Sequence, residues 1–215
     1  MTYTNTRVGS LLFPLASVLT VAALTGCSSP ISAVGSVAMQ MMGLSKQPEI
    51  PEDQKPPRPV HLQLQAGNNL NADEKQRAQA AVVRIYQLKD INAFWLAPYD
   101  AFVQPDRDRA ALGNSFVAMQ EITLAPGQSY DVVEKVPRIA KYIAIVTLFY
   151  APAPQRWRVA FDTEKSEKDG IVIGLHSCAM TATRGSIVAS QAPGQASQAK
   201  PQWNSLVSVN CPAGY

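Results

Sequence analysis

The sequence predicts an all-β fold, a two-sheet β-sandwich with one short helical insertion. Three observations indicate this class. About eight segments carry strand patterns at short spacing, turn-forming Pro and Gly residues separate many of them, and only one aromatic stretch has a helical pattern. We expect the sandwich to occupy residues 60–215, because the preceding residues have the composition of an export signal and a tether.

The N-terminal segment, residues 1–26, has the pattern of a secretory signal peptide. A positive charge at Arg7 precedes an apolar stretch over residues 11–24, which is too short to cross a bilayer as a helix. The stretch ends in Leu-Thr-Gly-Cys, which is typical of bacterial lipoproteins, so we expect cleavage before Cys27 and acylation of that cysteine. Ser28, in place of an aspartate, favours sorting to the outer membrane. The alternative is an ordinary secretory signal followed by an unused cysteine.

Residues 27–59 are predicted to form the lipid anchor and a Pro-rich tether. The part over residues 28–44 is small and apolar, which favours a flexible leader, with a short amphipathic helix as the alternative. The part over residues 46–59 should be extended, reaching about 40 Å. Proline fixes the backbone angle and removes amide donors there, at Pro48, Pro51, Pro56, Pro57 and Pro59.

Alternation with period two starts at Val60 and predicts the first strand over residues 60–66, with one face in the core and one in water. A polar loop over residues 67–79 follows. The second strand is predicted over residues 81–88, again with apolar residues on one face.

A helical insertion is predicted after the second strand. Asn92 can cap a short helix that begins an aromatic stretch over residues 94–102, interrupted at Pro98. Another helical turn is predicted over residues 106–112, ended by Gly113. An insertion this apolar requires a surface to cover.

The remaining strands are predicted from β-branched and aromatic runs between turn residues. Ala-Pro-Gly-Gln over residues 125–128 predicts a hairpin between its two flanking strands. A Gly-, Ser- and Gln-rich region over residues 184–202 is predicted to be a mobile surface loop. The predicted strands cover residues 116–124, 129–136, 142–150, 157–162, 170–183 and 206–211.

Two cysteines remain after Cys27, and we expect Cys178 and Cys211 to form a disulfide in an oxidising compartment. Closing a loop of this size stabilises a fold by about 2 to 4 kcal/mol. The alternative, a redox or metal site on His176 and Cys178, needs more ligands than the chain offers, since His61 is its one other histidine.

The sequence predicts no enzyme. It contains no nucleophile elbow, phosphate loop, zinc-protease motif or isolated pair of carboxylates, so we assign no catalytic residue, no metal and no cofactor beyond the lipid on Cys27. The net charge of +3 comes without a basic cluster, which argues against a nucleic-acid partner.

A series of motifs between residues 60 and 161 resembles the outer-membrane lipoprotein of type VI secretion systems, the TssJ (SciN) family. The series comprises V-H-L-Q-L-Q-A from Val60, V-V-R-I-Y-Q-L from Val82, the aromatic insertion, A-L-G from Ala111, L-A-P-G-Q-S from Leu124 and the Trp157 strand, all behind a lipoprotein signal. The resemblance implies a transthyretin-like sandwich anchored in the outer membrane and facing the periplasm. It also implies binding to the periplasmic C-terminal domain of a TssM-like inner-membrane protein, which itself joins a TssL-like protein.

The resemblance further implies that the loop between the first two strands, residues 67–79, contacts the partner. On this basis we predict a partner-binding set in which hydrogen bonds set specificity and Leu70 is an apolar anchor: Asn68, Asn69, Leu70, Asn71 and Asp73. The alternative is a plain connecting loop.

Two other classes of protein stay open. A periplasmic ligand-binding module would have a pocket, which Trp95, Tyr99 and Phe102 are placed to line. A pilotin-like module would bind an extended peptide along a long free sheet edge.

Overall fold

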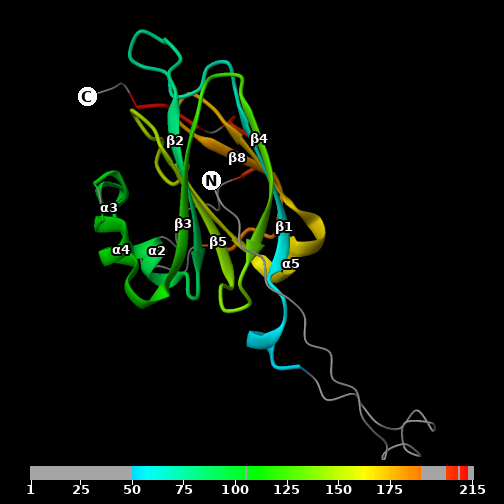
Figure 1. The fold of residues 1–215 in the computed structure, drawn as a ribbon. Helices are drawn as coiled ribbons and strands as arrows, with labels where there is room; N and C mark the ends of the chain where they lie inside the picture. The colour runs from blue at the N-terminus through cyan, green and yellow to red at the C-terminus, as the bar shows by residue number, and fades with distance from the viewer. Residues whose placement is uncertain (1–49, 105, 190–201, 208, 213–215) are drawn as a thin grey trace, which may run out of the picture. The chain divides into compact units, whose positions relative to one another are not determined.

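Two four-stranded sheets form the domain in the computed structural model, which describes residues 50–104, 106–189, 202–207 and 209–212 (Figure 1). The strand orders are β4-β1-β7-β8 and β3-β2-β5-β6, so the predicted two-sheet sandwich is confirmed. The strands are β1 (Arg58–Ala66), β2 (Ala81–Leu88), β3 (Phe116–Leu124), β4 (Ser129–Val136), β5 (Tyr142–Leu148), β6 (Arg158–Asp162), β7 (Ile171–Leu175) and β8 (Met180–Arg184).

Helical segments are short, and all except η1, which precedes β1, lie between strands. They are η1 (Glu52–Gln54), α2 (Asn92–Leu96), α3 (Tyr99–Val103), α4 (Arg107–Leu112), η2 (Gly113–Ser115) and α5 (Thr163–Asp169). The predicted signal, Cys27 and most of the tether lie outside the described residues.

Strand β1 shows how the sequence pattern sets the fold. Its apolar residues Val60, Leu62 and Leu64 are fully buried, while the alternate positions carry polar side chains. The strand is central in its sheet, antiparallel to β4 and parallel to β7. Side chains from both sheets join one continuous core that includes β1 and β5 residues.

The predicted hairpin of residues 116–124 and 129–136 is wrong. These strands are β3 and β4, and they belong to different sheets: Leu124 pairs with Ala81 of β2, whereas Ser129 pairs with Gln65 of β1. The intervening turn, with Gly127 at φ 76°, carries the chain across the edge of the sandwich. A tight turn specifies the reversal of the chain, but the sheet that each strand joins depends on partners elsewhere.

Two further expectations need correction near the C-terminus, and one helix there was not predicted. The strand predicted over residues 170–183 is a hairpin of β7 and β8, and the described residues of 206–211 form no strand. Helix α5 was not expected. Its N-cap Asp162 accepts a hydrogen bond from the Lys165 amide at 3.1 Å, and Gly170, at φ 70°, ends it.

The helical insertion covers the outer face of the β2 sheet (Figure 1). Tyr86 points outward from β2 and is fully buried there, packing edge-to-face on Phe102 with the ring centroids 5.8 Å apart. Its hydroxyl donates to Oδ2 of buried Asp108 at 2.6 Å, which links strand and insertion. The expected Asn92 cap is wrong, because Asn92 is the first helical residue and its amide donates to Oδ1 of Asp90.

Candidate functional site

The loop over residues 67–80 is built onto the end of β7. The Gly67 amide donates to the Leu175 carbonyl at 2.8 Å, and the amides of Asn71 and Ala72 donate to the carbonyls of His176 and Ser177 at 3.0 and 3.1 Å. These bonds continue the β1–β7 pairing past the end of the strands. The loop is therefore ordered by main-chain contacts rather than free to sample many shapes.

Two of the predicted partner-binding residues face the interior. Leu70 has 0% exposure and belongs to the core, so the expectation that it anchors a partner is wrong. Asn71 is 7% exposed, at φ 48°, and its amide group accepts from the Tyr150 amide at 2.6 Å and donates to the Ala80 carbonyl at 2.9 Å. Both side chains hold the loop in place.

Asp73 organises the tip of the loop. Its carboxylate accepts from the amides of Lys75 and Arg77, both at 2.9 Å, and from the Arg77 guanidinium at 2.6 to 2.7 Å. The hydrogen bond from Arg77 lowers the pKa of Asp73 below its usual value. Asp73 is thus a structural acid whose side chain is largely covered.

The loop exposes residues 68–69 and 74–80. Asn68 and Asn69 are exposed, and Asn68 lies against the β3–β4 turn at Gly127. Glu74 and Gln76 are exposed and line a hollow that includes neither of these two asparagines. Of the predicted set, Asn68 and Asn69 are therefore the two with side chains open to a partner.

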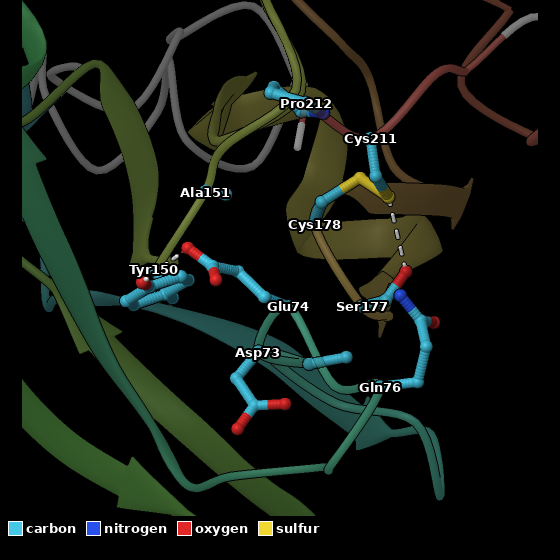
Figure 2. A pocket seen from close by; sticks show the side chains of 10 residues that line it. Asp73, Glu74, Gln76, Tyr150, Ala151, Ser177, Cys178, Cys211 and Pro212 are labelled. Atoms are coloured by element: carbon cyan, nitrogen blue, oxygen red, sulfur yellow. Dashed lines mark hydrogen bonds between the residues drawn. A yellow bond between two sulfur atoms is a disulfide. The ribbon is translucent and has the colours of Figure 1, made fainter. Parts of the chain in front are cut away.

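A hollow of about 440 Å³ lies beside the Glu74 side of the loop (Figure 2). Glu74 lies next to Tyr150, whose hydroxyl is 3.4 Å from Oε1 of Glu74, and the negative charge of Glu74 raises the pKa of Tyr150. The hollow draws its lining from four separate stretches of the chain: Ala72, Asp73, Glu74 and Gln76, then Tyr150 and Ala151, then Ser177 and Cys178, and finally Cys211 and Pro212.

The predicted disulfide between Cys178 and Cys211 is present and forms one side of this hollow. The two Cα atoms are 5.6 Å apart, and the Ser177 hydroxyl lies 3.2 Å from Sγ of Cys211. No local sequence pattern marks Tyr150 or Ser177 as neighbours of the loop, so sequence reasoning missed both.

The aromatic residues of the insertion do not line a pocket as the ligand-binding alternative expected. Phe102 and Trp95 are 0% and 7% exposed, and Phe94 packs edge-to-face on both, with ring centroids 5.7 and 5.1 Å away. Tyr99 donates its hydroxyl to the Phe149 carbonyl at 2.7 Å. These rings fill a small core between helices and sheet.

The free-edge alternative expects a long sheet edge, and β3, with nine residues, is paired only with β2 in the part of the chain that the structure describes. Strands β3 and β4 are edge strands, but β4 carries exposed Asp131 and Lys135 and a buried, inward-facing Glu134. Charges placed this way discourage the addition of another strand.

Each of the two histidines contacts a polar side chain of a neighbouring strand. His61 is exposed, with Nε2 3.3 Å from Asp131, and half-buried His176 lies 2.9 Å from the Thr181 hydroxyl. Burial lowers the pKa of His176. Within the part of the chain that the structure describes, no three metal-binding side chains come together, and no helix has the length and apolar character to span a membrane.

Comparison with protein families matches residues 58–178 to the family described as Type VI secretion lipoprotein (VasD, EvfM, TssJ). The match covers more than half of the chain, and the protein therefore belongs to this family of type VI secretion lipoproteins. The family is that of a scaffold lipoprotein of the secretion system, not of a known enzyme. No curated protein sequence gives a significant match.

Three of the solved structures that contain a similar chain show the range of this likeness. One, in a structure described as a type VI membrane complex, is 26% identical with a TM-score of 0.53, over 58% of this chain and 97% of that chain. The T6SS lipoprotein TssJ1 from Pseudomonas aeruginosa is 27% identical with a TM-score of 0.52, over 64% and 100%. A chain in a structure described as the T6SS protein TssM C-terminal domain (869-1107) from EAEC is 26% identical with a TM-score of 0.50, over 57% and 95%.

Proposed function

We propose that this protein is a periplasmic lipoprotein, anchored in the outer membrane through lipid on Cys27, that docks the membrane complex of a type VI secretion system. It binds the periplasmic domain of a TssM-type inner-membrane subunit and is joined through that subunit to a TssL-type protein. Membership of the lipoprotein family and similarity to a chain of a type VI membrane complex support this proposal.

The similarity to a chain in the TssM structure supports the choice of partner. An alignment to 57% of these 215 residues covers 95% of the matched chain, which is therefore much shorter than the segment 869-1107. We infer that the matched chain is a lipoprotein chain bound to that segment. The same pairing is proposed for the present protein.

The observation that carries the proposal is the ordered loop over residues 67–80. Its main chain is fixed by hydrogen bonds to residues 175–177, and Asn71 ties it to Tyr150, so little ordering entropy is lost when a partner binds. Asn68 and Asn69 present amide donors and acceptors on this fixed frame. Such a surface suits recognition by directional hydrogen bonds.

The proposal is tested by calorimetry with the full-length lipoprotein in detergent and the periplasmic domain of the TssM-type protein from the same organism. Saturable binding is expected, and changing both Asn68 and Asn69 to Ala should weaken it about tenfold or more. Asn114→Ala, an equally exposed change next to the helical insertion, is the matched control and should leave the affinity unchanged. Absence of binding by folded protein would refute the docking role.

A further inference from the structure

The last described part of the chain, residues 202–207 and 209–212, lies beyond the family match, which ends at residue 178. We call these residues the C-terminal segment. The disulfide joins the final position of the family match to this segment, because it links Cys178 to Cys211. The disulfide thus fixes the segment, at a defined point, to the part of the fold that the family match covers.

The segment is also held by contacts other than the disulfide. The Arg156 guanidinium donates to the carbonyls of Gln202 and Ser205 at 3.0 and 3.2 Å and lies 5.2 Å from the Trp203 ring centroid. The Trp203 carbonyl accepts from the Ala182 amide at 2.7 Å. The segment is therefore bound at a specific place, through one main-chain bond to β8 and the side chain of Arg156.

Apolar contacts also hold the C-terminal segment in place. Leu206 and Val209 pack against a small buried cluster of Ala153, Cys178 and Ala179. This cluster directs the chain so that Cys211 and Pro212 reach the rim opposite Glu74 (Figure 2). The hollow exists in this form because the C-terminal segment supplies one of its walls.

The charges in the lining have one sign. Asp73 and Glu74 are its ionisable carboxylates, and no lysine or arginine is among the described residues that line it. Asp73 is already bound by Arg77, whereas Glu74 has only a long 3.4 Å contact with the Tyr150 hydroxyl. Glu74 is free to turn toward an incoming cation, with the hydroxyls of Tyr150 and Ser177 as further acceptors.

We propose that this hollow receives a lysine or arginine side chain of the TssM-type partner, and that the disulfide-held C-terminal segment is therefore part of the docking surface. The inference rests on the proposed function, since it names a subsite beside the ordered loop. The negative charge of Glu74 supports a basic occupant. Continuity with the loop and a volume that admits a long side chain support a residue of the docked partner.

The test compares three variants of the full-length lipoprotein in detergent, titrated with the periplasmic domain of the TssM-type protein at low and high salt. Glu74→Gln removes the charge at constant shape and should weaken affinity about five- to tenfold at low salt, with a smaller effect at high salt. Cys178→Ala with Cys211→Ala frees the C-terminal segment and should weaken affinity about threefold or more at both salt concentrations. Asp169→Asn, an exposed charge on α5, is the control and should have no effect.

The outcomes separate this inference from the docking role. If wild type binds and neither Glu74→Gln nor the double cysteine variant weakens binding, the subsite is refuted while the docking role stands. A salt-independent effect of Glu74→Gln would refute recognition of a basic side chain. If wild type itself does not bind, the proposed function fails and this subsite with it. The Glu74→Gln comparison remains decisive even if the double cysteine variant does not fold.

Discussion

Replacing Arg158 by methionine tests how the helical insertion is fixed to the sandwich. Arg158 begins β6, is 8% exposed, and donates to the carbonyls of Phe94, Ala97 and Trp95 at 2.6 to 2.7 Å. In the described part of the chain, no carboxylate lies within ion-pair distance of it. Burial lowers the pKa of Arg158 to about 10, so the cation persists at neutral pH.

The magnitude follows from the groups left behind. Methionine keeps the apolar stem but leaves three carbonyls at the end of α2 without their donor, and hydrogen bonds from a charged group contribute about 1.5 to 3 kcal/mol each. Water can reach some of these carbonyls, since neighbouring Leu96 is 67% exposed. We therefore expect the free energy of unfolding to fall by about 3 to 5 kcal/mol. Arg158→Lys should lower the free energy of unfolding by less than Arg158→Met does, because one ammonium group cannot reach all three carbonyls as the planar guanidinium does.

Urea unfolding followed by tryptophan fluorescence and by circular dichroism measures the effect, because Trp157 and Trp95 lie 4.5 and 5.5 Å from the guanidinium. Arg107→Met, which removes an exposed arginine bonded to Gln104, is the matched control and should change the free energy of unfolding by less than about 0.5 kcal/mol. A loss below about 1 kcal/mol for Arg158→Met, with coincident transitions in both signals, would refute the reasoning.

Three further predictions concern other residues. Burial raises the pKa of Glu134, and its Oε1 has no hydrogen-bond partner, so the ionised form lowers the stability of the fold as pH rises through the folded-state pKa. Glu134→Gln should therefore stabilise the protein by about 1 kcal/mol at neutral pH and not at acidic pH. A difference in thermal unfolding that does not depend on pH would contradict this. Leu70→Ala should reduce the free energy of unfolding by about 2 to 5 kcal/mol, against less than about 0.5 kcal/mol for Asn69→Ala, in the same urea experiment. Cys27→Ser should abolish incorporation of labelled fatty acid and move the protein to the soluble fraction, and unchanged labelling would exclude Cys27 as the acceptor.

The strand segments were predictable because a half-buried strand records its two environments in alternate residues. Val60, Leu62 and Leu64 alternate with polar residues, and this pattern sufficed to place β1. The pairing of β3 and β4 was not predictable from their turn, because each strand chooses its sheet through contacts with β2 or β1. Period and turn chemistry are local, whereas sheet membership is not.

The candidate site shows the same limit at the level of single residues. Leu70 stands in a polar loop, and its burial depends on main-chain bonds between that loop and residues about a hundred positions away. Tyr150 and Ser177 join the hollow through the same long-range contacts. The disulfide was predictable by contrast, because the sequence assigns Cys27 to the lipid and the two other cysteines then have one way to pair.

The proposed function has lipid holding the protein at one end and a partner holding it at the other, and the direction of β1 then has a mechanical consequence. The chain enters the sandwich at Arg58, just after Pro56, whose carbonyl accepts a hydrogen bond from the Arg138 guanidinium at 2.7 Å. It leaves β1 about 30 Å further on, at the ordered loop. A pull between the anchor and the loop is therefore directed along β1. Both attachment points lie at the ends of this one extended strand, so its covalent backbone carries the pull. Its hydrogen bonds to β4 and β7 lie across that direction and are not opened one after another. The strand that connects the two attachment points is thus placed to bear load without unzipping the sheet.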